Sequence, residues 1–150
     1  MIAVQEDRFD PAALLAQLSA DLTAGAVASF VGLVRSFAED ATVSALELDH
    51  HPVLTEKIVR HIGDDARARF RLTGVCIVHR CGTLHPGEPI VFVGAAAAHR
   101  RAAFDAVDYM MDRLKTEAPF WKREQRSDGA HWIEARASDH ADRSRWEEPA

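Results

Sequence analysis

Two of the three lysines in the chain flank one short segment whose residue types could carry chemistry. Lys115 and Lys122 enclose Pro119, Phe120 and Trp121. If a helix ends just before the proline and extended chain follows, the turn directs both ammonium groups towards one pocket with an aromatic wall. A lysine that is desolvated beside another cation has a lowered pKa, which suits it to acid–base, nucleophilic or oxyanion-stabilising work.

The same spacing also has a purely structural explanation. A lysine at position 115 complements the dipole of a helix that ends there, and a lysine at position 122 is simply solvated. Because lysines with perturbed pKa values are a minority of all lysines, spacing alone favours this explanation. Both interpretations therefore stay open at this level.

A second group of cations stands at the expected start of a helix. His99, Arg100 and Arg101 oppose the helix dipole at that position. A bound phosphate would remove the conflict, because helix N-termini offer free amide groups and arginine offers bidentate donors. Arg35, at the end of an apolar strand, is a further candidate anion donor. Pairing with carboxylates or with a partner subunit explains these side chains equally well.

The histidines and cysteines match no metal-binding template. The chain has eight histidines, and His79 and His85 straddle a turn, but there is no HExxH motif and no paired CxxC motif. Cys76 lies among apolar strand residues, and its spacing to Cys81 is not that of a CxxC motif. We therefore expect no metal ion, and two free thiols in a reducing compartment.

The composition excludes several classes of protein. The 150 residues are 47% hydrophobic and 27% charged, which predicts one soluble globular domain over 1–150. The chain has neither a long apolar stretch nor a signal-peptide pattern, so we expect a cytoplasmic protein with no membrane segment. The net charge of −5 disfavours nonspecific binding to nucleic acid or to an anionic membrane. Residues 113–126 carry five basic and two acidic side chains, which fits a compact anionic ligand or an acidic partner tail.

Hydrophobic periodicity predicts a mixture of helices and strands. Apolar residues at helical spacing predict helices over 10–24, 53–70 and 99–117. Apolar or alternating runs predict strands over 26–35, 43–50, 72–80, 90–96, 123–126 and 132–135. The first strand is apolar on both faces and is expected to be central, and the first two strands could form a long hairpin. Helices segregated among such strands indicate an α+β domain, followed by a polar tail over 138–150 that is expected to be mobile.

These segments together resemble the large, catalytic subunits of molybdopterin synthase, the MoaE family. The resemblance covers residues 26–136, and its most specific part is MDRLKTEAPFWKRE at 111–124. Shorter matches follow in the expected order at Phe30–Arg35, Leu48–Pro52, Val78–Gly82, Ala98–Arg100 and Trp132–Arg136.

The resemblance implies a sulfurtransferase of molybdenum cofactor biosynthesis. Family members take sulfur from the thiocarboxylated C-terminal glycine of a small ubiquitin-like sulfur-carrier subunit. They insert two sulfurs into cyclic pyranopterin monophosphate to form the dithiolene of molybdopterin, and no further cofactor is expected. The resemblance also implies a homodimer with a carrier at each end, a heterotetramer, and an α/β hammerhead-like core with an additional antiparallel β subdomain.

The resemblance further assigns residues to the site. Lys115 and Lys122 match the two family lysines of the carrier-tail pocket and are the expected catalytic residues. Lys115 would stabilise or protonate the oxygen displaced by the thiocarboxylate, and Lys122 would position the carrier carboxylate or share proton transfer. The expected substrate-binding residues are both lysines with Leu33, Val34, Arg35, His99, Arg100, Arg123, Glu124 and Arg136.

Within that set, the phosphate is assigned to three residues. Arg35, His99 and Arg100 are expected to hold it, and Arg136 is a candidate contributor across the dimer. Family members place a lysine where this chain has Leu33, so one basic contact of the phosphate site is absent.

Two other functions compete with this assignment. A noncatalytic adapter could use the same basic pocket to hold the acidic C-terminal tail of a ubiquitin-like protein. It would need only that pocket, whereas this chain also has the separate anion-binding cluster, which favours the enzyme. A metal-dependent hydrolase would require stoichiometric zinc or manganese.

Overall fold

A four-stranded sheet forms the centre of the molecule in the computed structural model, which describes residues 1–147. The strand order is β1 (Ile2–Gln5), β5 (Gly74–Arg80), β7 (Pro89–Ala97) and β2 (Ala26–Leu33). β1 runs parallel to β5, and the other neighbouring strands are antiparallel. The inner strands β5 and β7 are almost entirely buried, as expected of short continuous apolar runs.

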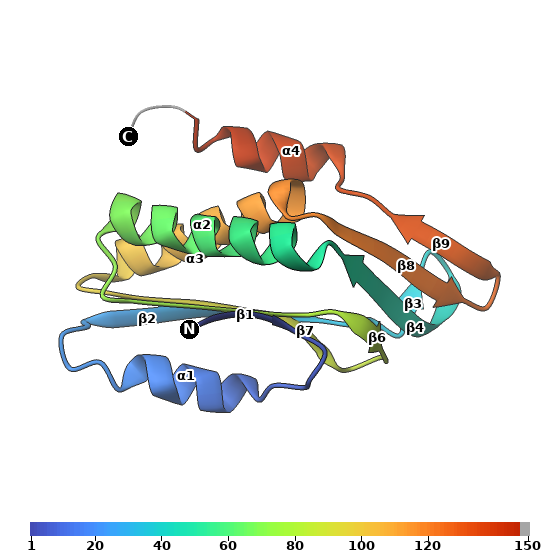
Figure 1. Ribbon diagram of the computed structural model, residues 1–150, viewed down its shortest axis with the longest axis horizontal. Helices are drawn as coiled ribbons and strands as arrows, with labels where there is room; N and C mark the ends of the chain where they lie inside the picture. Colours follow the sequence, from blue (N-terminus) through green and yellow to red (C-terminus); the bar gives the residue numbers. More distant parts are fainter. Residues whose placement is uncertain (148–150) are drawn as a thin grey trace.

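Helices cover both faces of this sheet (Figure 1). α2 (Pro52–Phe70) and α3 (Arg100–Glu117) lie on one face, and α1 (Pro11–Ser19) lies on the other. Successive residues of β5 point to opposite faces, so Ile77 packs under α2 and α3 while Val78 packs against α1. Within residues 1–147, no helix is long and apolar enough to cross a membrane.

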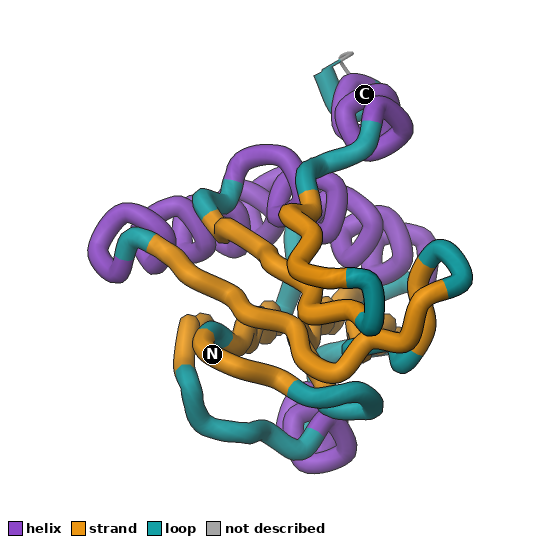
Figure 2. The backbone as a smooth tube through the Cα atoms, turned by 90° about the vertical axis from the view of Figure 1, so that its right-hand side faces the viewer, coloured by secondary structure: helices purple, strands orange, loops and turns teal. Residues whose placement is uncertain are grey.

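A second sheet extends from one end of the first, and Figure 2 views the molecule from that end. Its path is β3 (Phe37–Ala38), β4 (Ala41–His50), β8 (Phe120–Arg126) and β9 (Gly129–Ile133), and β6 (Gly82–Leu84) also pairs with β4. All of these pairings are antiparallel. The sheet has its own small core, formed by Val34, Leu46, Leu48, Leu84 and Ile90. The expected α+β class with an additional antiparallel β subdomain is confirmed.

The expected place of the first strand is wrong in two respects. β2 is an edge strand of the central sheet, and it pairs with β7 instead of forming a hairpin with β4. Its two faces are apolar because α3 packs on one side and α1 on the other. Covered faces produce this pattern at an edge as readily as at the centre, so the pattern alone does not locate the strand.

The polar tail contains a helix where the sequence predicts a mobile segment. α4 (Ala137–Ser144) lies against α3. Beyond it, the indole ring of Trp146 packs edge-on against Phe70 and Tyr109, with ring centroids 6.0 and 5.5 Å apart. These partners are far away in the sequence, and α4 has no buried residue of its own, so local periodicity does not reveal the docking. Residues 148–150 of the predicted tail lie outside the described residues.

Candidate active site

The two flanking lysines meet in a pocket of about 790 Å³ where α3, β8 and β9 come together. Lys115 lies half-exposed on the last turn of α3, and Lys122 lies on β8. α3 ends at Ala118, which has extended backbone angles before Pro119, as expected of a residue that precedes proline. The predicted convergence of the lysines on one pocket with Phe120 in its wall is therefore confirmed.

Two buried side chains hold the turn between the lysines. The hydroxyl of Thr55, on α2, donates a hydrogen bond to the carbonyl oxygen of Pro119 at 3.3 Å. The ring of His79, on β5, stacks on Phe120 with centroids 3.8 Å apart and an angle of 15° between the planes. The Nδ1–H of His79 donates to the carbonyl oxygen of Arg80 at 2.8 Å. The pocket wall is thus fixed to the central sheet and to α2.

The electrostatics of the pocket favour a reactive lysine. Burial lowers the pKa of Lys122, and the nearby ammonium group of Lys115 lowers it further, whereas the charge of Asp139 opposes both effects. Desolvation and a like charge each disfavour the protonated form of an amine. Lys122 therefore reaches its neutral form at a lower pH than a solvated lysine does, which fits it to exchange protons.

Arg35 lines the same pocket and is held there by a buried carboxylate. Glu124, on β8, is 5% exposed and accepts hydrogen bonds from Arg35 at 3.0 Å and from Arg126 at 3.2 Å. Arg126 also pairs with Glu39 at 3.3 Å, and the side chain of Arg35 stays half-exposed to the pocket. Glu124 thus orients Arg35 towards an anionic ligand.

Three further predicted site residues line the pocket, and Arg123 does not. Leu33, Val34 and Arg136 are among its lining residues, and Arg136 reaches it within the same chain, from the residue before α4. Arg123 is not among the lining residues, because alternation along β8 places it on the face opposite Lys122. There Arg123 forms an ion pair with Glu47.

The cations at the start of α3 do not reach the pocket of their own chain. His99 and Arg100 stand at the N-terminal end of α3, whereas Lys115 lies on its last turn. A helix of 18 residues is about 27 Å long, so the two groups lie at opposite ends of it. Within one chain, the structure therefore does not bring His99 and Arg100 together with Arg35 around one phosphate.

Two pocket residues, Ser138 and Asp139, are not among the residues predicted from the sequence. Asp139, in the first turn of α4, lines the pocket and lies 3.9 Å from the Nζ atom of Lys115. The residues Ser138 and Asp139 read as part of a polar tail, so no sequence signal marked either of them.

Among residues 1–147, no cluster of three or more His, Cys, Asp or Glu side chains is placed to hold a metal ion. The cysteines at 76 and 81 are free and buried, and burial raises the pKa of both thiols.

The buried His79 makes stability depend on pH. Burial lowers its pKa from 6.5 to about 3. Between these values the unfolded chain binds a proton that the folded chain does not, so the free energy of unfolding falls by up to about 1.4 kcal/mol per pH unit as the pH decreases. His79→Phe keeps an aromatic ring against Phe120 and removes this titration. Urea unfolding from pH 7 to pH 4 is expected to show a shallower pH dependence in the variant.

The control for this prediction is the exposed His140. His140→Gln should leave the pH dependence of unfolding as it is in the unsubstituted protein. Equal slopes for His79→Phe and the unsubstituted protein would contradict the account of a buried, neutral histidine.

Comparison with known proteins identifies the family. The family model described as MoaE protein matches residues 4–117. The chain belongs to the MoaE family. Its similarity to the molybdopterin synthase catalytic subunit of Pseudomonas aeruginosa is 50% identity over 148 residues, which is 98% of this chain and 99% of that protein.

Solved structures of MoaE proteins share the fold. The MoaE protein of Burkholderia ambifaria superimposes with a TM-score of 0.81 at 43% identity, covering 99% of this chain and 100% of that one. A protein–protein complex of subunits 1 and 2 of the molybdopterin-converting factor of Helicobacter pylori contains a chain with a TM-score of 0.72. That chain is 19% identical and covers 90% of this one, a likeness that shows the fold alone.

Proposed function

We propose that this MoaE protein is the catalytic subunit of a molybdopterin synthase. It takes sulfur from the thiocarboxylated C-terminal glycine of a small ubiquitin-like carrier and inserts two sulfurs into cyclic pyranopterin monophosphate. The observation that carries this proposal is the pair Lys115 and Lys122 in one pocket with the anion donor Arg35. The reaction needs no further cofactor, and the two free cysteines fit a reducing cytoplasm.

The two lysines have different roles because their surroundings differ. The half-exposed ammonium group of Lys115 stabilises the oxygen that the thiocarboxylate displaces from the pterin. Lys122, whose pKa is lowered by burial, binds the carrier's terminal carboxylate and shares the proton transfer. Lys115 acts on negative charge that develops during the reaction, and Lys122 acts on the negative charge of the carrier tail. The pocket is partly desolvated, so both contacts are stronger there than in water.

We further propose that the pterin phosphate binds between two copies of the chain. Arg35 supplies one donor, and His99 and Arg100 of a second copy supply the others, because their own chain holds them at the far end of α3. The unpaired edge of β2 and the exposed apolar side chains of Phe30 and Phe104 support this homodimer. With one carrier at each end, the assembly is a heterotetramer.

The direct test of the function is a reaction of purified components. The protein is mixed with thiocarboxylated carrier and cyclic pyranopterin monophosphate, and molybdopterin is measured. Molybdopterin is expected to form, and carrier that binds tightly without product would favour the adapter instead.

Mixed dimers test the shared pocket. Lys115→Ala and Arg100→Ala homodimers are each expected to lose most activity. If each pocket combines Lys115 of one copy with Arg100 of the other, random subunit exchange leaves one intact pocket in every mixed dimer, and about a quarter of full activity returns. A pocket built within one chain would give no recovery, which would contradict the proposal.

A further inference from the structure

α4 brings a carboxylate into the lysine pocket. Oδ1 of Asp139 lies 3.9 Å from Nζ of Lys115, and its Oδ2 accepts a hydrogen bond from the backbone N–H of Arg136 at 2.8 Å. The side chain is 18% exposed, and its negative charge also raises the pKa of Lys122. Asp139 thus acts on both lysines from an element that lies outside the sheet and the two long helices.

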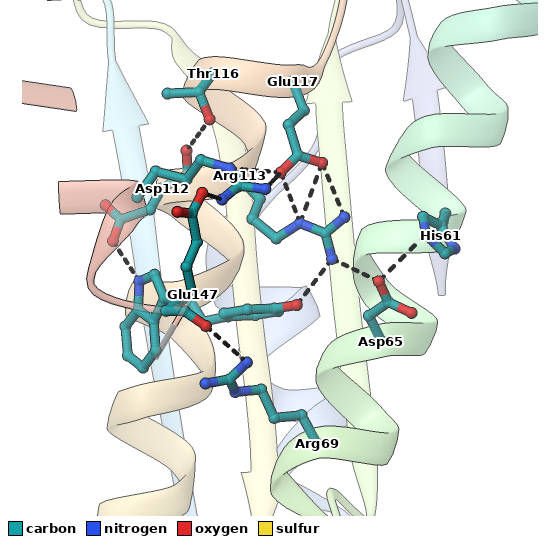
Figure 3. Close-up of polar contacts among 11 residues, drawn as sticks. His61, Asp65, Arg69, Asp112, Arg113, Thr116, Glu117 and Glu147 are labelled. Carbon is teal, nitrogen blue, oxygen red and sulfur yellow. Dashed lines mark hydrogen bonds and ion pairs between the residues drawn. The ribbon is translucent and has the colours of Figure 1, made fainter. Parts of the chain in front are cut away.

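The position of Asp139 is set by anchors away from the pocket. Arg143, at the end of α4, pairs with Glu117 at 2.9 Å. Asp112 accepts hydrogen bonds from Arg145 at 2.9 Å and from the indole N–H of Trp146 at 2.7 Å. Figure 3 shows Asp112 and Glu117 on α3 within this cluster of polar contacts. Because these contacts dock α4, the 3.9 Å contact between Lys115 and Asp139 can break, and another anion can replace Asp139, while the helix stays docked.

The other charged groups that line the pocket are paired with other residues, have the same sign as the lysines or are exposed to solvent. Glu124 is held between Arg35 and Arg126. Arg35 and Arg136 are cations, and Glu134 is exposed on the chain between β9 and α4. Asp108 and Asp112, which line a second pocket beside Lys115, are bonded to Arg145. Among residues 1–147, Asp139 is therefore the carboxylate that lies within 4 Å of an ammonium group of the lysine pair.

We propose that Asp139 is a resident counter-ion of the lysine pair that competes with the carboxylate at the C-terminus of the incoming carrier. In the free enzyme it offsets the repulsion between the two ammonium groups. When the carrier tail enters, its terminal carboxylate binds Lys122 and replaces Asp139 as the negative charge beside the lysine pair. The identity of the tail rests on the proposed function, whereas the counter-ion role rests on the contacts of Asp139 alone.

Lysine titration tests the counter-ion role directly, because Lys57, Lys115 and Lys122 are the only lysines. Asp139→Asn removes the charge and keeps an oxygen that can accept from the N–H of Arg136. Carbon-13 NMR of the lysine side chains is expected to show the midpoint of Lys122 at a lower pH in this variant, because the charge that raises its pKa is gone.

A matched variant separates this effect from changes in α4 itself. Asp142→Asn removes a charge from the same helix, at a residue that lies outside the pocket of Lys122 but lines a second pocket with Lys115, so the midpoint of Lys122 is the readout. The midpoint of Lys122 should stay in place in this variant. An unchanged midpoint of Lys122 in Asp139→Asn, or equal shifts in the two variants, would overturn the proposal.

Carrier binding tests the competition. The probe is purified carrier that ends in an ordinary carboxylate, titrated calorimetrically into the full-length protein. Asp139→Asn is expected to bind it about twofold to fivefold more tightly, and Asp142→Asn with unchanged affinity. Equal or weaker binding by Asp139→Asn would overturn the competition and leave the proposed function intact. Failure of the unsubstituted protein to bind the carrier at all would overturn both.

Discussion

Lys115→Ala is expected to lower the rate of sulfur transfer by at least about 100-fold. The substitution removes the ammonium group that faces the displaced oxygen, and Lys122 alone does not replace it because its own pKa is lowered by burial. The measurement is the rate of molybdopterin formation with thiocarboxylated carrier in excess. The fold should persist, since the side chain of Lys115 is half-exposed and its contact with Asp139 is long.

The control for this prediction is Lys57→Ala. Lys57 is exposed on α2, outside the residues that line the pocket, so its removal should leave the rate unchanged. Lys122→Ala is expected to behave like Lys115→Ala. Full activity of Lys115→Ala would show that the central residue of the proposed site has no part in the reaction.

Arg113→Met is expected to lower the free energy of unfolding by about 3 kcal/mol or more. The guanidinium group of Arg113 is 10% exposed and bonds to Asp65 at 2.6 Å, to Tyr109 at 2.8 Å and to Glu117 at 2.8 Å. Figure 3 shows it between α2 and α3. Removing it leaves Asp65 without its arginine partner in a partly buried site, and leaves Glu117, an anchor of α4, with Arg143 alone. Urea unfolding at neutral pH measures the loss.

An exposed ion pair provides the comparison. Arg60 pairs with Glu56 at 2.9 Å on the solvent side of α2, and both side chains are about half-exposed. Arg60→Met should change the free energy of unfolding by less than about 1 kcal/mol. Similar losses in the two variants would contradict the view that burial of Arg113 is what makes its network costly to break.

Local patterns gave the lysine pocket as one of two open interpretations. The proline at 119 and the helical spacing before it predicted that Lys115 and Lys122 would converge, and both physical conditions are met. The bounds of the long helices and of most strands were also predicted to within a few residues, because the apolar face of each element is formed by residues close together in the sequence. The α+β class followed from the order of these elements.

Contacts between distant segments account for what the sequence did not reveal. The pairing of β2 with β7 and of β4 with β8 depends on packing across the whole chain, not on hairpin signals. The docking of α4 depends on ion pairs and on Trp146, and the approach of Asp139 to Lys115 follows from it. A polar helix held in this way has no apolar periodicity to predict it.

The separation of the two cation groups could have been found from the sequence. A helix predicted over 99–117 already places His99 and Lys115 at opposite ends, because the rise is about 1.5 Å per residue. Family resemblance grouped them in one site, and helix geometry shows that one chain does not bring them together. The proposed homodimer reconciles the two observations.

The most direct test of the central claim counts sulfur in one reaction. The purified protein is mixed with cyclic pyranopterin monophosphate and a limiting amount of thiocarboxylated carrier, and carrier mass and molybdopterin are followed together. The account predicts that two carriers lose their sulfur for each molybdopterin formed, and that Lys115→Ala stops both changes. Carrier that binds tightly and keeps its sulfur, with no molybdopterin formed, would contradict it.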